Sequence, residues 1–151
     1  MTFHRVDLDR LVRDIVEAEF VNDSRVTVES ARETVCVMGD STSLASVIRH
    51  LLENAVKYGL GREVNVSVAR ATDDIGNAVL KVTDRGMGIK VDELRLVFDK
   101  FFRGKLLGGS ASDGLGLALV RELVLLHRGH TCLESEVGKG TTVTLHLPAV
   151  E

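Results

Sequence analysis

Residues 40–59 carry the pattern that most restricts how this chain can fold. Their apolar residues recur in steps of three and one, as on the broad face of an amphipathic helix. They are Leu44, Val47, Ile48, Leu51, Leu52, Ala55 and Val56. Asp40 or Ser41 can cap the start of this helix, and Gly59 can end it. A face this wide needs a second layer to cover it, so we predict that the helix packs on a sheet.

The candidate strands lie on both sides of this helix. They occupy residues 25–29, 34–38, 63–71, 77–84, 131–136 and 141–148. We expect the third and fourth to pair antiparallel around the turn-like sequence TDDIG, and the last two to form a hairpin around VGKG. Pro148 is expected to end the last strand.

Three further segments have helical patterns. Residues 7–20 repeat apolar side chains at helical spacing behind Asp7 as the N-cap, and residues 115–128 are apolar nearly all round. Residues 91–102 indicate one or two short helices, whereas residues 103–114 are rich in Gly, Ser and Ala, which is typical of a mobile loop. The whole pattern predicts an α+β fold, a two-layer sandwich with helices packed on one face of a sheet.

The size and charge of the chain narrow its class. With 44% hydrophobic residues, residues 1–151 suit a single globular domain. The net charge of -3, with both signs interspersed, lacks the basic surface that nucleic-acid binding requires, so we expect no nucleic-acid partner. No apolar run approaches the roughly 20 residues that span a bilayer. The N-terminus also lacks signal-peptide features, so we expect a cytoplasmic chain without direct membrane contact.

Several common chemistries have no support in the sequence. Cys36 and Cys132 lie in separate apolar segments without CxxC or Cys/His spacing, so we expect buried thiols and no metal site on them. A GxGxxG motif starting at Gly114 fails at Leu119, and GxxxxGK[ST] fails at Gly140. No GxSxG elbow occurs. Rossmann, P-loop and hydrolase sites are therefore unsupported.

Three short segments could instead form a binding site. DRGMGI, residues 84–89, ends an apolar strand; it is either a simple turn or a place where glycines admit a ligand and Asp84 accepts its hydrogen bond. SDGLGLAL, residues 112–119, is either an ordinary loop–helix junction or a helix start that binds phosphate. The residues alone leave both alternatives open.

The third segment is the polar side of the long helix. At 100° per residue, His50, Asn54 and Lys57 lie within about 60° of one another, opposite the apolar stripe. A solvated helix face explains this arrangement equally well. However, an asparagine amide oxygen can bind Mg²⁺, and a lysine one turn further along can bind phosphate.

Taken in order, HLLENAVKYG, DRGMGI, VFDKFFRG and DGLGLAL resemble the N, G1, F and G2 boxes of the ATP-binding catalytic domain of sensor histidine kinases. This domain belongs to the Bergerat-fold superfamily, shared with gyrase, MutL and heat-shock chaperone ATPases. The final ESEVGKGTTVTLHLP is similar to the closing hairpin of the family, so the resemblance covers nearly the whole chain. It implies a mixed, mostly antiparallel sheet and the cofactors ATP and Mg²⁺.

The resemblance also implies roles for individual residues. Asn54 matches the magnesium ligand, and Lys57 and Arg103 match residues that contact the phosphates, so these three are the candidate catalytic residues. Asp84 matches the aspartate that accepts a hydrogen bond from the adenine amino group, with Gly86 and Gly88 leaving room for the base. An ATP lid is implied at about residues 103–113. The other implied nucleotide-site residues are Tyr58, Ile89, Phe98, Phe101, Gly114, Leu115, Gly116 and Leu117, with Phe102 completing the F box.

Three departures from the family pattern affect the expected function. Ser112 replaces the first glycine of the usual GxGxG in the G2 box. His50 stands where related hydrolytic ATPases carry a glutamate base, so fast ATP hydrolysis is not expected. None of the five histidines lies in an acid-flanked H-E/D-x-x-x-P sequence. The phosphoacceptor and dimerisation domain is therefore expected to be absent from these residues.

The leading hypothesis is a histidine kinase catalytic domain that transfers the γ-phosphate of Mg²⁺-ATP to a histidine on a separate dimerisation domain. That domain would belong to the same kinase or to its dimer mate, with a response regulator downstream, and the parent kinase can be membrane-anchored. The alternatives are a serine kinase of the anti-sigma-factor type and a nucleotide-gated binding module without transfer. The acid stability of the phosphorylated product would discriminate between them.

Overall fold

The computed structural model describes residues 1–29, 31, 33–71, 76–89 and 111–150, with side chains from 117 onward in the last range. The described helices are α1 (Leu8–Glu19), α2 (Ser41–Tyr58) and α4 (Ala111–Leu126). The described strands are β1 (His4–Asp7), β2 (Val26–Glu29), β3 (Cys36–Gly39), β4 (Val64–Arg70), β5 (Asn77–Asp84), β6 (His130–Glu136) and β7 (Gly140–Val150).

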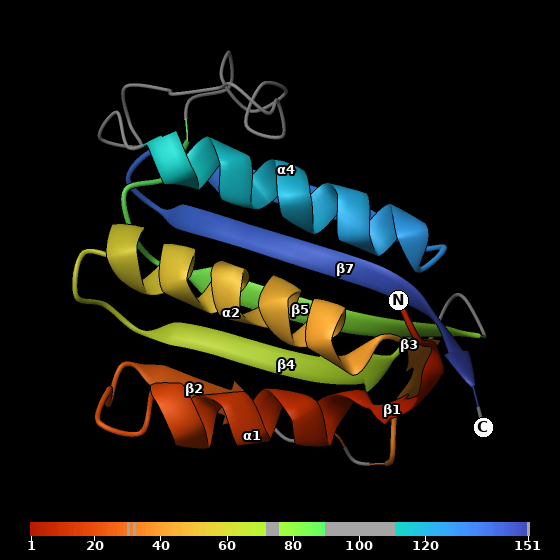
Figure 1. The fold of residues 1–151 in the computed structure, drawn as a ribbon. Coiled ribbons are helices and arrows are strands. Elements are labelled where there is room, and N and C mark those ends of the chain that lie inside the picture. Colours follow the sequence, from red (N-terminus) through yellow and green to blue (C-terminus); the bar gives the residue numbers. More distant parts are fainter. Residues whose placement is uncertain (30, 32, 72–75, 90–110, 151) are drawn as a thin grey trace.

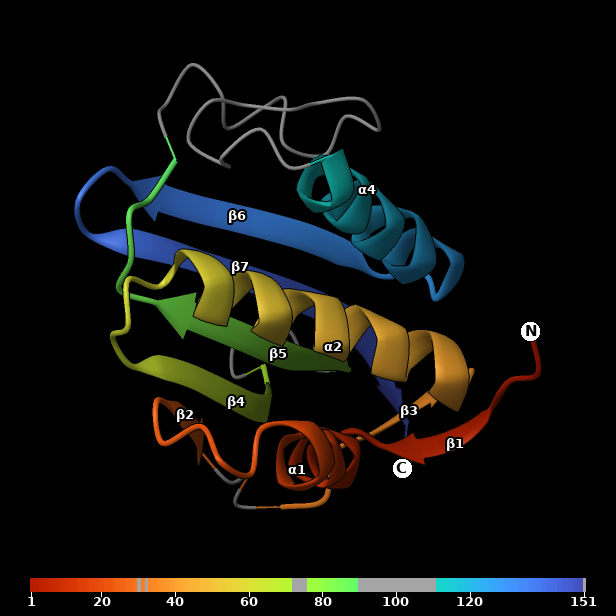
Figure 2. The ribbon, with the colours of Figure 1, turned by 60° about the vertical axis from the view of Figure 1, so that its left-hand side comes forward.

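The strands form one sheet, and the described helices lie on one face of it (Figures 1 and 2). The strand order is β1-β3-β7-β5-β4-β2, with β6 also paired to β7. Among the described strands, β2 and β4 pair in parallel and every other pairing is antiparallel. The predicted α+β sandwich, with its mixed and mostly antiparallel sheet, is therefore confirmed.

The core lies between the helices and the sheet. The predicted apolar face of α2 is buried from Leu44 to Ala55, with Val56 partly buried. Alternate residues of the central strands point at it, and each of them is at most 8% exposed; they are Val64, Val66, Val68, Ala78, Leu80, Val82, Val143, Leu145 and Leu147. This period-two burial is why these segments form strands rather than helices.

Two predicted N-caps fix where α1 and α2 begin. Asp7 accepts a hydrogen bond from the Arg10 backbone N–H at 3.1 Å. Asp40 accepts from the Ser43 N–H at 2.9 Å and from the Ser43 hydroxyl at 2.7 Å. These two bonds to Ser43 hold the pKa of the Asp40 carboxyl below its usual value. Both helices end close to the predicted residues.

Four details differ from the sequence-based expectations. β1 was not predicted, since only Val6 of its four residues is buried and so short a segment shows no period. α4 begins at Ala111, because alanine favours the helix; residues 111–114, expected in the loop, are helical. Pro148 lies inside β7, where pairing passes from β5 to β3. Cys132 is exposed because it points away from the core, whereas Cys36 is buried as expected.

Candidate functional site

A largely apolar pocket opens between α2, the end of β5 and the β6–β7 hairpin. It holds about 600 Å³ of empty space, including the part open to solvent. Its lining residues are Leu51, Asn54, Ala55, Tyr58, Val82, Asp84, Met87, Gly88, Ile89, Leu117, Leu133, Thr141 and Val143. A pocket of this size with a few polar groups suits a small organic ligand with a flat apolar part.

Asp84 supplies the one carboxylate in the described lining of this pocket. It is the last residue of β5 and only 9% exposed, and its Oδ1 accepts a hydrogen bond from the Gly86 N–H at 2.9 Å. Burial raises the pKa of Asp84 above its usual value, and the backbone N–H groups of Gly86 and Thr141 offset part of this increase. A carboxylate has about four acceptor positions, so it keeps capacity for a donor on a ligand.

Backbone hydrogen bonds hold the segment after Asp84 between α2 and the β6–β7 hairpin. The Met87 N–H donates to the Tyr58 carbonyl at 3.2 Å, and the Met87 carbonyl accepts from the Gly138 N–H at 2.9 Å. The Ile89 N–H donates to the Ser135 hydroxyl oxygen at 2.8 Å. The wall of the pocket is thus fixed from both sides, which is the preorganisation a binding site needs.

The two glycines of DRGMGI lie in close contact with the backbone of other segments. A Cβ at Gly86 would overlap the Tyr58 carbonyl oxygen, and a Cβ at Gly88 would overlap the Glu136 carbonyl oxygen. Gly88 also has φ of +74°, which side chains rarely adopt. We expected both glycines to leave room for a ligand. The structure shows that they also allow backbone segments to approach one another, and of the two only Gly88 lines the pocket.

Contrary to the sequence-based prediction, the polar residues of α2 do not all lie opposite its apolar face. Asn54 lines the pocket within the stripe formed by Leu51, Ala55 and Tyr58, rather than lying opposite the apolar face. Lys57 lies about 60° further round the helix, is exposed and is outside the lining. Its Nζ lies 5.4 Å from the Tyr58 ring centroid. Asn54 therefore contributes its amide to the pocket itself, and Lys57 lies at its border.

The structure brings together part of the predicted site. The predicted residues that line the pocket are Asn54, Tyr58, Asp84, Gly88, Ile89 and Leu117, whereas Lys57 and Gly86 lie beside it. The backbone of Gly114, Leu115 and Gly116 lies in the first turns of α4. Phe98, Phe101, Phe102, Arg103 and residues 103–110 of the predicted lid lie outside the described residues. Their roles, and the functional roles of the lining residues, stay predictions.

Seven of the described lining residues were not among the predicted site residues. They are Leu51, Ala55, Val82, Met87, Leu133, Thr141 and Val143. Helical spacing offered a signal for two of them, because Leu51 and Ala55 share one stripe with Asn54 and Tyr58. Three others, Leu133, Thr141 and Val143, belong to the β6–β7 hairpin. It begins more than 40 residues after DRGMGI, so only the sheet pairing could reveal them.

Comparisons with known proteins agree with this architecture. Residues 39–151 match the family described as histidine kinase-, DNA gyrase B-, and HSP90-like ATPase. The sensor-like histidine kinase SenX3 of Mycobacterium tuberculosis is 35% identical over 96% of this chain and 36% of its own length. The sensor protein kinase PmrB of Pseudomonas aeruginosa is 32% identical over 99% of this chain and 31% of its own length. The chain thus spans about a third of the length of these relatives.

Solved structures show the same fold. A structure of the mycobacterial sensor histidine kinase MprB has a TM-score of 0.79, with 30% identity over 98% of both chains. The catalytic domain of histidine kinase ThkA, at 21% identity, has a TM-score of 0.76 over 98% of both chains and shows the fold alone. Among the described residues, no helix is long and apolar enough to cross a membrane.

Proposed function

Because the chain belongs to the histidine kinase-, DNA gyrase B-, and HSP90-like ATPase family, we propose that its pocket binds Mg²⁺-ATP and presents the γ-phosphate to a histidine on a separate domain. The single observation that carries this proposal is the buried Asp84 carboxylate at the apolar pocket. The sensor-kinase names of its relatives support the histidine as acceptor.

We propose that Asp84 reads the adenine ring. The adenine amino group is a donor, and the ionised carboxylate keeps acceptor capacity beyond its bond to Gly86. Ile89, Leu133 and Val143 supply apolar surface for the faces of a flat base. A buried acceptor that loses its donor costs free energy, so this arrangement discriminates for bases that carry an amino group.

The phosphates would lie towards the C-terminal end of α2, which carries Lys57, and the N-terminal end of α4. The N-terminus of α4, with Gly114 and Gly116 in its first turns, offers unpaired N–H groups and the positive end of the helix dipole. Lys57 and Arg103 would add positive charge. The Asn54 amide oxygen at the pocket fits Mg²⁺, which takes few protein ligands and uses phosphate oxygens for others. Bound Mg²⁺ would neutralise charge that develops on the transferring phosphoryl group.

The proposed partners follow because none of the five histidines lies in a phosphoacceptor motif, so the nucleophile must come from another domain. They are the phosphoacceptor histidine domain of the same kinase or its dimer mate, and a response regulator downstream. Because ATP is a cytoplasmic metabolite, we place the working domain in the cytoplasm, whether or not its parent kinase is membrane-anchored.

Calorimetric titration of Mg²⁺-ATP into the wild type and Asp84→Asn tests the proposed site. Asparagine can keep the acceptor for Gly86, but it then presents an NH₂ donor to the ligand. We expect a loss of about 1–3 kcal/mol, or roughly 5- to 150-fold in affinity. Asp9→Asn is the matched control, because Asp9 is also a buried aspartate but belongs to α1 and pairs with Arg13. Equal affinities of Asp84→Asn and the wild type would remove Asp84 from the site.

The chemical stability of the phosphorylated product tests the transfer. With a histidine domain as acceptor, the product is a phosphoramidate and should be lost in acid. An acid-stable phosphoserine on a protein substrate would instead indicate a serine kinase of the anti-sigma-factor type. Tight ATP binding with no product on either acceptor would indicate a binding module.

A further inference from the structure

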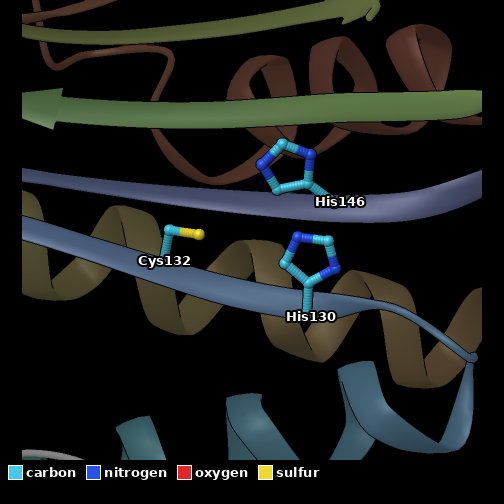
Figure 3. Close-up of side chains that lie close together, drawn as sticks. All are labelled: His130, Cys132 and His146. Atoms are coloured by element: carbon cyan, nitrogen blue, oxygen red, sulfur yellow. The ribbon is translucent and has the colours of Figure 1, made fainter. Parts of the chain in front are cut away.

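Three metal-binding side chains meet on the sheet face opposite the helices. His130 and Cys132 extend from β6, and His146 extends from the neighbouring β7 (Figure 3). One ligand atom of each residue lies within 4.8 Å of the other two. None of the three lines the nucleotide pocket, which lies on the helix side of the sheet.

The backbone pairing of the hairpin fixes this juxtaposition. His130 stands directly opposite His146, and Cys132 stands opposite Thr144, two pairs further along. Because side chains alternate across a strand, His130 and Cys132 point to the same face. Directly opposite pairs have Cβ atoms about 4.5–5.5 Å apart, and diagonal neighbours remain within reach. The cluster therefore follows from the register and not from one choice of rotamers.

The side chains of the cluster are accessible to a metal ion. His130 and Cys132 are exposed and His146 is half-buried. The two imidazole rings stack with centroids 4.4 Å apart and planes 7° from parallel. The sulfur of Cys132 points toward His130 (Figure 3). Within the described part of the chain, none of these three side chains makes an ion pair or a hydrogen bond, so rotation of the rings disrupts only their stacking.

We propose that His130, Cys132 and His146 form a binding site for a borderline transition-metal ion, of which Zn²⁺ is the representative. Zn–N bonds of about 2.0 Å and a Zn–S bond of about 2.3 Å place tetrahedral donors roughly 3.3–3.6 Å apart. The donors of the cluster reach this spacing by small rotations of side chains that are not packed in the core. The fourth position stays open to water or to a ligand from solution.

The donor set separates this site from the Mg²⁺ of the nucleotide. Imidazole and thiolate prefer Zn²⁺ and similar ions, whereas Mg²⁺ prefers oxygen ligands. We expected no metal site on the cysteines, because neither lies in CxxC or in a linear Cys/His metal-binding spacing. The signal was instead H-x-C on one strand, completed by a histidine on its partner strand. The proposed metal site does not rest on the proposed kinase function.

Titration of Co²⁺ and Zn²⁺ into the reduced 151-residue chain tests the site. We expect one ion per chain and a thiolate-to-cobalt absorption band, which reports a bond to sulfur. Cys132→Ser and His146→Asn should each weaken Zn²⁺ binding by at least the approximately 10- to 100-fold that loss of an outer-shell partner costs. Cys132→Ser should also abolish the cobalt band. Because Cys132 is exposed, this variant is expected to fold normally.

His4→Ala is the matched control, since His4 is an exposed histidine on β1 of the same sheet but outside the cluster. Its Zn²⁺ affinity should equal that of the wild type. Zn²⁺ should also raise the unfolding temperature of the wild type and of His4→Ala, but not that of Cys132→Ser. Absence of the cobalt band in the wild type, or equal Zn²⁺ affinity in Cys132→Ser, would overturn the proposal.

Discussion

Gly88 combines two constraints that Gly86 and Gly138 carry separately. Its φ of +74° is unfavourable for any side chain, and a Cβ there would lie 2.9 Å from the Cα of Val137 and overlap the Glu136 carbonyl. Gly86 has the overlap without the positive φ, and Gly138 has φ of +83° with open space around it. Alanine substitutions at these three positions therefore measure the cost of backbone strain and the cost of steric overlap separately.

We expect Gly88→Ala to be the most destabilising alanine substitution among these three positions. Strain alone, measured with Gly138→Ala as the control, should cost about 1–2 kcal/mol of unfolding free energy. Collision should add about 1–3 kcal/mol in Gly88→Ala. Chemical denaturation of each variant measures these values. Equal losses at Gly88 and Gly138 would show that the β6–β7 turn yields to the new methyl group.

The shifted pKa values of Asp84 and Asp40 predict that the two residues change the stability of the protein with pH in opposite directions. Burial raises the pKa of Asp84 in the folded protein, so the folded state binds its proton more tightly than the unfolded state does. The contribution of Asp84 to stability should therefore decrease as pH rises from the unfolded value of 3.8 through the raised pKa. For Asp40, bonds to Ser43 lower the pKa, so its contribution is present above 3.8 and is lost as pH falls through the lowered pKa.

Urea unfolding of the wild type, Asp84→Asn and Asp40→Asn over this pH range measures both effects. The stability of the wild type relative to Asp84→Asn should fall with rising pH, and its stability relative to Asp40→Asn should increase. Asp40→Asn thus serves as the control of opposite sign. A parallel increase for both variants would mean that Asp84 is not significantly desolvated in the folded chain.

At the scale of single elements, α4 ends in a Schellman motif with an unusual residue. The Gly129 N–H donates to the Val124 carbonyl at 2.9 Å, and the Arg128 N–H donates to the Leu125 carbonyl at 3.0 Å. Arg128 occupies the left-handed position of this motif with φ of 64°, where glycine is usual. The chain therefore carries a small, local strain at this helix end.

Arg128→Gly is expected to stabilise the chain by about 0.5–1 kcal/mol, since the relief of left-handed strain exceeds the added entropy of an unfolded glycine. Thermal unfolding should show an increase of the midpoint by a few degrees. Arg128→Ala keeps the Cβ and removes the rest of the side chain, so it should give no such increase. Stabilisation by alanine as well would attribute the effect to the lost charge.

Element boundaries were predictable where a local signal marks them. The caps Asp7 and Asp40 and the apolar stripe of α2 gave both helices nearly to the residue. The start of α4 was missed because glycine, serine and alanine are compatible with both loop and helix. Pro148 was misread as a strand end, because its missing N–H is tolerated where β7 changes partner.

At the scale of the whole molecule, the sheet register determines which residues distant in sequence lie together, and no local sequence pattern contains this information. The resemblance singled out Asp84, which is buried at the pocket, but not Leu133 and Val143, which complete the wall around it. For the glycines of DRGMGI we predicted room for a ligand, and the close contacts with Tyr58 and Glu136, distant in sequence, were not predictable from the segment itself. The same register brings His146 to His130 and Cys132.

The placement of the histidines predicts that the 151-residue chain does not phosphorylate itself. His127 is buried, with Nδ1 bonded to the Leu123 carbonyl at 2.7 Å and Nε2 accepting from the Asp40 N–H at 3.1 Å. His130 and His146 stack on the sheet face away from the pocket. His4 and His50 do not line the pocket either. None of the five histidines therefore lines the pocket in which we propose that the nucleotide binds, so none is positioned there for in-line attack on the γ-phosphate.

Incubation with radiolabelled Mg²⁺-ATP should accordingly leave the chain unlabelled, while an added phosphoacceptor domain of a related sensor kinase should gain an acid-labile label. At ATP concentrations below saturation, Asp84→Asn should reduce this label by about the same factor as it reduces ATP affinity, since it removes binding rather than the nucleophile. Asp9→Asn should label the added domain like the wild type. Strong self-labelling that survives replacement of all five histidines would contradict the histidine kinase mechanism, because the phosphate would then rest on another residue of this chain.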